Sequence, residues 1–470
     1  MQRYTNRNIL KITLPVLVSL LMEQLVGLTD TIYLGHYGDG RTELAASALA
    51  GVFYLVVFML GFGFSVGAQV LIARRNGEGR LHEIGPVFMQ GSLFLLLLAA
   101  LLFALSRLCA EGLFSLLVEQ QAVRRAAVDY LDWRVWGFFF SFAAAMFRAL
   151  YVGTTRTRIL TANSVVMVLT NVVLNYLLIF GRCGLPELGI AGAAIASVAA
   201  EAVSVLFFLL YTRLRFDWRR YRLFRFGGVD LRLLGHILSI SVWVMLQEGM
   251  AFLSWFLFFV CIERLGTDQL AVTNMVRSIG SVVFLFVNAF ASTASSLVSN
   301  LIGAGHAEEV RPLCRRMTRL CFSFVVPLAL LIALFPERVL GFYSDDARLV
   351  AYGVPSLWVM LSTYVLCVPA FIGQFAVSGT GHTRVTLGIV LAAILFYMAY
   401  TLWLTLVLRA DVALCWTTDH LYYLVTLLLS VLYLRSGRWQ RGPCSAPCCG
   451  KSGAGGGAKL RPEGGGWTVG

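Results

Sequence analysis

Carboxyl and amide side chains occur inside stretches of this sequence that are otherwise apolar. Glu23 and Asp30 lie in the first stretch. Seven residues at about 100° each place them on one face of a helix, about 10 Å apart along its axis. Asn171 and Asn175 have the i,i+4 spacing that also gives a single face. An ionisable group in hydrocarbon costs roughly 2.5–3.5 kcal/mol, so this stripe requires a protein-lined or water-filled cavity. Such residues suit the reversible binding of a small cation.

These polar residues also have structural interpretations. Asp30 is alternatively an interfacial acid that caps a turn, and asparagines inside membranes often serve only to bond neighbouring helices. Gly189, Ala193 and Ser197 repeat at four-residue spacing and predict a close helix contact, and Glu201 continues the same stripe. We therefore expect Glu201 to face protein rather than lipid.

The second half of the chain offers a candidate second site. Gln247, Glu248 and Arg277 interrupt its apolar stretches, and we group them with Glu201. Arg277 is equally consistent with a structural ion pair to Glu248 and with a role in substrate binding.

Enzyme motifs are absent from the sequence. It contains no hydrolase elbow, P-loop, HExxH or dinucleotide fingerprint. The ten cysteines are scattered without a CxxC pair, and Asp345-Asp346 lacks the second acidic cluster of a Mg-diphosphate enzyme. The last apolar stretch contains Asp419 and His420, and such a histidine is most often a packing residue. We expect neither an enzyme nor a bound cofactor, and Na⁺ at Asp30 is the one metal ion considered.

The composition defines the elements that position these residues. Of the 470 residues, 58% are hydrophobic and 13% charged, with a mean hydropathy of +0.77, which excludes a soluble globular protein and a largely disordered chain. A span needs about 20 mostly apolar residues. The predicted spans are 9–34, 45–73, 86–106, 132–152, 159–180, 190–212, 236–262, 270–301, 317–336, 352–377, 385–408 and 412–433.

Basic residues indicate the orientation. The formal net charge is +13, and with the N-terminus inside, more than twice as many Arg and Lys flank the spans on that side as on the other. This excess includes Arg148, whereas Arg134 counts among the outside charges. The excess predicts that both termini are cytoplasmic, and it explains the positive charge without nucleic-acid binding.

An internal repeat divides the chain. Gly77 and Gly303 are separated by 226 positions, and so are Pro86 and Pro312. The same offset aligns GTTRTR at 153–158 with GTGHTR at 379–384. We predict an all-α polytopic membrane protein with twelve transmembrane helices in two pseudo-symmetric six-helix bundles, an arrangement typical of transporters. The predicted domains are an N-lobe (1–212), a cytoplasmic basic linker (213–235), a C-lobe (236–434) and a disordered Gly-rich tail (435–470).

Several motifs resemble those of the multidrug and toxic compound extrusion (MATE) family, of the bacterial type. The resemblance covers about residues 10–434. The motifs are Leu14-Pro15, Leu28-Thr29-Asp30-Thr31, Gly67-Ala68-Gln69, Asn171-x3-Asn175, Leu188 to Ala194, and Gly379-Thr380-Gly381-His382-Thr383.

The resemblance implies export of organic cations, driven by inward flow of protons or sodium ions. It also implies that Asp30 binds the coupling ion with Asn171, Asn175 and Ser197 beside it. Several proton-coupled members have Asp at the position of Asn175, so this chain departs from them. Some members have a C-lobe cation site with a seventh-helix Glu, near Glu248 here, and a tenth-helix Asp, which this chain lacks.

We therefore expect a monomeric antiporter in the bacterial cytoplasmic (inner) membrane, surrounded by lipids. It would export cationic or amphipathic small molecules, with Asp30, Asn171, Asn175, Ser197 and Glu23 as its cation-coupling residues. Two alternatives remain open. A flippase for lipid-linked oligosaccharide or another lipid-like substrate would need several cavity arginines for diphosphate. An intramembrane lipid transferase would need a clustered metal or acid–base set.

Overall fold

The protein consists of helices joined by short turns. The computed structural model describes residues 4–38, 41–117, 120–225 and 228–441, and these residues contain no strand. Within this part, eleven helices are long and apolar enough to cross a membrane, and the bent pair α4 (Gln121–Arg134) and α5 (Gly137–Gly153) makes a twelfth span. The predicted all-helical class with twelve spans is confirmed.

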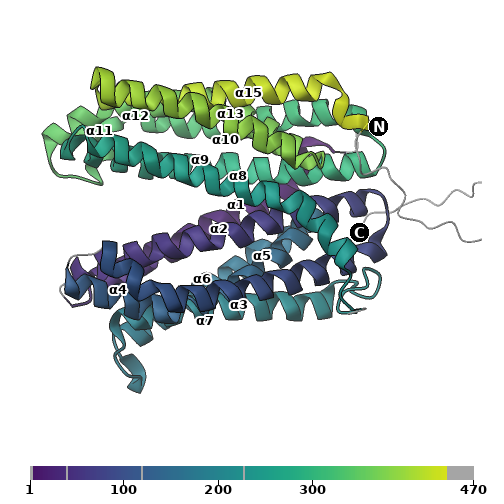
Figure 1. Cartoon of the computed structure of the whole chain (residues 1–470), viewed down its shortest axis with the longest axis horizontal. Helices are drawn as coiled ribbons and strands as arrows, with labels where there is room; N and C mark the ends of the chain where they lie inside the picture. Colours follow the sequence, from purple (N-terminus) through teal and green to yellow (C-terminus); the bar gives the residue numbers. More distant parts are fainter. Residues whose placement is uncertain (1–3, 39–40, 118–119, 226–227, 442–470) are drawn as a thin grey trace, which may run out of the picture.

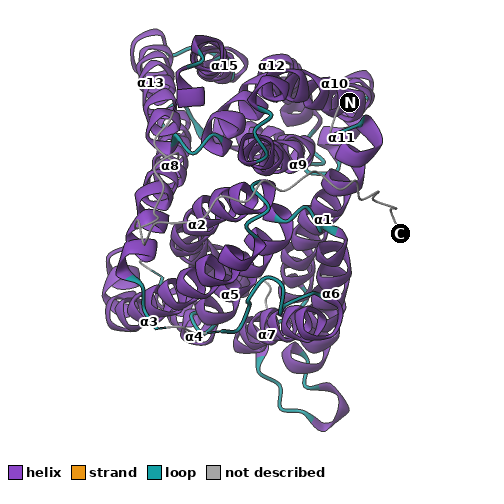
Figure 2. Cartoon of the chain, turned by 90° about the vertical axis from the view of Figure 1, so that its right-hand side faces the viewer, coloured by secondary structure: helices purple, strands orange, loops and turns teal. Residues whose placement is uncertain are grey.

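The two halves of the chain form two bundles, the N-lobe and the C-lobe, stacked on each other (Figure 1). Seen along the bundle, α2 and α9 face each other between the outer helices of the lobes (Figure 2). Besides α4 and α5, the N-lobe contains α1 (Asn6–Gly35), α2 (Arg41–Gly77), α3 (Ile84–Leu117), α6 (Arg158–Ile179) and α7 (Gly189–Arg215). The C-lobe contains α8 (Leu231–Glu263), α9 (Thr267–Gly303), α10 (Val310–Leu334), α11 (Pro336–Gly341), α12 (Ala347–Gly379), α13 (Thr383–Leu402), α14 (Val412–Cys415) and α15 (Thr418–Ser436).

The fourth span begins earlier than the sequence predicts. Its predicted range was 132–152, but helix starts at Gln121 and bends by 50° between α4 and α5. α4 is amphipathic: Val123, Ala127 and Tyr130 are buried, whereas Asp129 on the other face is exposed. A hydropathy average mixes the two faces and misses such a helix.

The predicted basic linker and the predicted tail are both partly helical. α7 continues to Arg215, and α8 begins at Leu231, where Asp230 caps its first turn by accepting hydrogen bonds from two backbone N–H groups. The prediction of disorder from residue 435 is wrong for residues 435–441, because α15 ends at Ser436 and a short helix follows over Arg438–Arg441. Residues 442–470 lie outside the described residues.

Two glycines of the internal repeat lie where the lobes touch. Gly77 of α2 packs against the backbone of Asn300 in α9, and Gly303 of α9 packs against the backbone of Arg74 in α2. A Cβ atom on either glycine would collide with a carbonyl oxygen of the other lobe. The pseudo-symmetric pair therefore permits the closest backbone approach between the lobes.

Hydrogen bonds reinforce this contact. Asn76 Nδ2 donates to Asn300 Oδ1 over 2.6 Å, and Ser299 Oγ donates to the carbonyl oxygen of Val70 over 2.7 Å. Ser296 of α9 reaches the backbone of α5 at 2.7 Å. These bonds lie at the end of the molecule that holds both described chain ends (Figure 1). The lobes are closed at that end.

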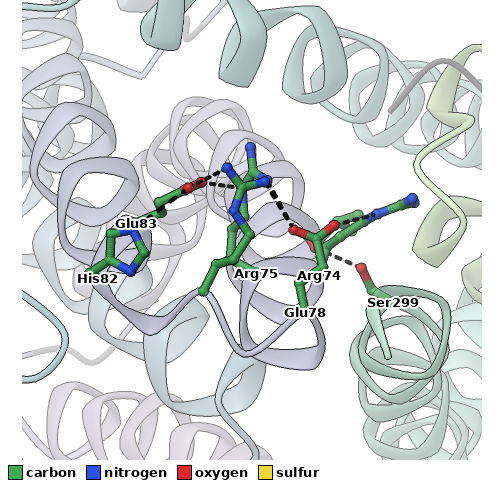
Figure 3. Close-up of polar contacts among 8 residues, drawn as sticks. Arg74, Arg75, Glu78, His82, Glu83 and Ser299 are labelled. Carbon is green, nitrogen blue, oxygen red and sulfur yellow. Dashed lines mark hydrogen bonds and ion pairs between the residues drawn. The ribbon is translucent and has the colours of Figure 1, made fainter. Parts of the chain in front are cut away.

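An ion-pair network fixes the turn after α2, beside Ser299 of α9 (Figure 3). Glu78 accepts hydrogen bonds from Arg74 over 3.4 Å and from Arg75 over 2.9 Å, and Arg75 also pairs with Glu83 at 3.0 Å. Because these side chains are partly exposed, each pair contributes little to stability alone. Together they orient the turn next to the lobe interface.

The close contact at Gly303 predicts that alanine destabilises the protein at this position but not at a glycine with open space around it. Gly303→Ala should destabilise the protein by about 1–3 kcal/mol, because the added Cβ overpacks the interface. Gly388→Ala in α13 is the matched control: nothing lies within 4 Å of a Cβ there, and alanine favours helix by about 1 kcal/mol. Thermal unfolding of the purified variants in detergent measures both. Equal shifts for the two variants would contradict the close approach.

Candidate functional site

Three predicted residues surround Asp30 in the N-lobe. Asn171 Nδ2 and Asn175 Nδ2, both on α6, donate to Asp30 Oδ1 over 3.1 and 2.5 Å. Ser197 Oγ on α7 donates to Asp30 Oδ2 over 2.9 Å. Both asparagines are fully buried, and Asp30 is half-buried. α1, α6 and α7 thus hold one carboxylate between three donors, and the predicted grouping of these residues is observed.

Small residues explain how α7 comes close enough. The backbone of Gly192 lies against the carbonyl of Leu178 in α6, where a Cβ would be 2.6 Å from the oxygen. The N–H of Leu188 also donates to this carbonyl over 3.0 Å. Gly192, which lies outside the predicted stripe, thus permits the close approach of α7 to α6 that places Ser197 beside Asp30.

Glu23 lies apart from the Asp30 cluster. Its carboxylate pairs with Arg148 of α5 at 3.0 Å and accepts a hydrogen bond from Ser19 over 3.3 Å. Ser19 and Ser164 are 2.7 Å apart. The sequence predicts that Glu23 groups with Asp30 and that Arg148 lies at the cytoplasmic end, but in the structure Glu23 and Arg148 pair with each other at the N-lobe cavity.

Glu201 is part of a second ion pair, with Arg134. Arg134 Nη2 lies 2.7 Å from Glu201 Oε1, and the guanidinium stacks 3.6 Å from the ring centroid of Tyr54. Tyr54 also donates to both carboxylate oxygens of Glu201 over 3.3 Å. Sequence reasoning missed Arg134 by counting it as an outside charge. The signal was Glu201 itself, because a protein-facing carboxylate requires a nearby cation.

One cavity of about 440 Å³ joins these groups, and we call it the N-lobe cavity. Of the described residues that line it, the acidic ones are Glu23, Asp30 and Glu201, and the basic ones are Arg134 and Arg148. Two carboxylates are paired with the two guanidiniums. Within this set Asp30 is the carboxyl with no ion-pair partner, so the ionised cavity carries one net negative charge.

The residues of the candidate second site do not come together. Glu201 lies in the N-lobe, whereas Gln247 and Glu248 lie in α8 and Arg277 in α9. Gln247 donates to Glu248 over a long 3.5 Å. No ion pair between Arg277 and Glu248 is formed in the described residues, so the structural-pair alternative for Arg277 is wrong. α8 and α9 are consecutive in the sequence, but the helix faces that carry Glu248 and Arg277 do not meet.

No metal cluster accompanies these groups. The described residues contain no set of three or more His, Cys, Asp or Glu that is arranged to hold a metal ion. The unpaired carboxyl of Asp30 can attract a cation when it is ionised, and it can bind a proton.

The protein has two helical lobes, each formed by one copy of the internal repeat, and a charged cavity inside the membrane. This arrangement defines a polytopic membrane transporter. A family model described as MatE matches residues 15–177 and 242–404, one segment in each half of the chain. The chain therefore belongs to the MatE family and is a MATE transporter of bacterial type, which confirms the resemblance seen in the sequence.

Curated relatives are similar over most of their length. The "Probable multidrug resistance protein NorM" of Synechocystis sp. is 26% identical over 344 residues, which cover 72% of this chain and 73% of that protein. The protein of the same name from Rhizobium meliloti is 26% identical over 339 residues, covering 71% of each.

Solved structures have the same fold. The outward-facing conformation of a multidrug resistance MATE family transporter superposes with a TM-score of 0.85 at 17% identity, covering 92% of this chain and 96% of that one. A MOP superfamily transporter from Pyrococcus furiosus gives a TM-score of 0.83 at 18% identity, covering 93% and 96%.

The largely buried ion pair of Arg134 and Glu201, whose side chains are 13% and 17% exposed, predicts a strongly non-additive stability effect. Arg134→Met or Glu201→Met alone should cost about 3–5 kcal/mol, because each leaves an uncompensated buried charge. The double variant should recover most of this loss. Thermal unfolding in detergent measures the cycle. Arg107→Met is the control, since its pair with Asp132 is nearly half exposed and is worth about 1 kcal/mol or less. A double variant less stable than both single variants would contradict the pairing.

Proposed function

We propose that this protein is a secondary active antiporter that exports cationic or amphipathic drugs in exchange for protons or sodium ions. The names of its curated relatives support drug efflux as the general function. The observation that carries the specific proposal is the charge of the N-lobe cavity. Among its described lining residues, Asp30 is the one carboxyl that has hydrogen-bond donors but no ion-pair partner.

The same carboxylate explains exchange. When Asp30 is ionised, the cavity attracts an organic cation through its single net negative charge. A proton that arrives from outside neutralises Asp30, and the cation loses this attraction and leaves. Because one carboxyl cannot serve both partners at once, binding of one opposes binding of the other. Alternate occupancy of one charge is the basis of antiport.

The contacts of Asp30 favour a proton over sodium as the coupling ion. All three neighbouring side chains turn an N–H or O–H donor toward the carboxylate. A hard metal cation requires oxygen ligands directed at it. A proton needs only the carboxylate oxygen, so it fits the arrangement without reorienting two buried amides.

The stoichiometry sets the driving force. Exchange of one proton for one monovalent cation moves no net charge, and it draws on the pH gradient, about tenfold per pH unit. Each further charge moved inward would gain about 2.3 kcal/mol per 100 mV, which is roughly fifty-fold in accumulation.

The flippase alternative lacks support in the cavity. A diphosphate needs unpaired arginines, but Arg134 and Arg148 are each paired with a glutamate. We place the protein in the bacterial cytoplasmic membrane as a monomer, with its closed end and both termini in the cytoplasm. The excess of arginine in the loops at that end supports this orientation.

Asp30→Asn should abolish coupled transport, because it removes the charge and keeps the shape. We expect the variant to insert, fold and lose dye efflux by at least tenfold. Asp345→Asn is the matched control, since Asp345 is exposed in the loop before α12. Efflux of an ethidium-like dye from cells, with membrane expression quantified in parallel, measures the effect. Full efflux by a folded Asp30→Asn protein would refute the role of Asp30.

The coupling ion is identified with purified protein in lipid vesicles. An imposed pH gradient alone should drive transport of an ethidium-like dye, and an imposed sodium gradient alone should not. Under one-for-one exchange, a membrane potential imposed without a pH gradient should have little effect. Transport driven by sodium at constant pH would instead assign Na⁺ to the Asp30 site and overturn proton coupling.

A further inference from the structure

The C-lobe contains a pocket that differs in chemistry from the N-lobe cavity. It has a volume of about 340 Å³, which is within the range of small-molecule sites. It lies between α8, α9, α12, α13 and α15, and we call it the C-lobe pocket. Its charged lining residues in the described chain are Arg277 of α9 and Asp419 of α15.

The charge of Asp419 has no partner among the described residues. No side-chain hydrogen bond or ion pair of its carboxylate occurs within the described residues. The adjacent His420 is turned away, because its ring nitrogens lie 2.9 Å from Ser362 and 3.1 Å from Thr363 on α12. Placement in the first turn of α15 favours a negative charge through the helix dipole, but it supplies no cation.

Arg277 is held in place but not neutralised. Its guanidinium lies 5.5 Å from the ring centroid of Trp255 and 5.8 Å from that of Phe259. Its Nε atom is buried without a hydrogen-bond partner in the part of the chain that the structure describes. Aromatic faces orient such a cation and leave its N–H groups free to bind an anion.

Both charged side chains line the same pocket. Gly280 and Ser281 follow Arg277 by three and four residues, so they share its face of α9, and both line the pocket. Gly280 packs against Met360 and Tyr364 of α12, and Ser281 adds a small polar side chain to the pocket wall. Arg277 and Asp419 form no ion pair with each other within the described residues. Both charges therefore remain available.

The remaining walls suit a flat apolar group. Trp255, Tyr364, Trp416 and Tyr422 line the pocket with aromatic rings. Tyr364 is fixed by donating to the carbonyl oxygen of Gly280 over 2.6 Å. Aromatic walls stack on rings and on organic cations.

We propose that the C-lobe pocket binds a zwitterionic aromatic molecule, with its cationic group at Asp419 and its carboxylate at Arg277. A ligand with both charges satisfies both side chains, whereas a simple cation leaves Arg277 unmatched inside the membrane. The proposal concerns binding and does not depend on Asp30 or on ion coupling. It assigns the two lobes different ligand chemistry.

Equilibrium binding to the purified protein in detergent tests this proposal. The probe is 4-(aminomethyl)benzoate, which has an ammonium group and a carboxylate at opposite ends of one ring. Its methyl ester retains the cation alone, and its N-acetyl derivative retains the anion alone. We expect the zwitterion to bind at least tenfold more tightly than either derivative, as measured by calorimetry. Equal affinity for zwitterion and ester would overturn the proposal, and so would no measurable binding of the zwitterion.

Substitutions locate the site. Arg277→Gln should weaken zwitterion binding at least tenfold and leave the ester unaffected, and Asp419→Asn should weaken both ligands. Arg277→Lys and Asp419→Glu retain the charges and should restore binding to within a few-fold. Arg338→Gln and Asp345→Asn, at exposed positions of the C-lobe, are the matched controls. If Arg277→Gln weakened zwitterion and ester equally, its role would be structural and the proposal would fail.

Discussion

The cost of an unpaired charge inside a membrane is the constraint on which this structure depends. Glu23 is neutralised by Arg148 and Glu201 by Arg134, across α1–α5 and α4–α7. These pairs link helices that line the N-lobe cavity, and they leave the charge of Asp30 unbalanced. Three hydrogen bonds stabilise this carboxylate, but no cation neutralises its charge. A cation or proton that enters the cavity can therefore neutralise it.

The repeat keeps the scaffold symmetric while the chemistry differs. Gly77 and Gly303 make equivalent contacts across the lobe interface, because backbone packing tolerates no side chain there. The offset that relates them also relates Asn171 to Tyr397, which lines the C-lobe pocket. An amide that bonds a carboxylate in one lobe thus corresponds to an aromatic ring in the other. Duplicated helices fix where the cavities lie, and side chains decide what each one binds.

The sequence was sufficient to predict the polar residues that lie within apolar stretches. Asp30, Asn171 and Asn175 are polar in apolar runs, and helical spacing placed them on common faces, so their meeting was predictable. Arg134 was missed because it lies at the start of the predicted span 132–152 and was counted there as an outside charge, whereas it ends an amphipathic helix that begins at Gln121. The expected pairing of Arg277 with Glu248 failed because neighbouring helices do not reveal which faces meet. Rotation of one helix about its axis depends on packing against the whole lobe.

The element that joins the candidate coupling site to the lobe interface is α1. Near one end it carries Asp30, which is bonded to α6 and α7 of its own lobe. Near the other end, its Ile9 is fully buried within the hydrophobic core of the C-lobe. A change in the hydrogen bonds of Asp30 therefore acts on a helix that both lobes hold. Packed cores shift between discrete arrangements rather than deforming smoothly, so a local change in charge at Asp30 can bias how the two lobes meet.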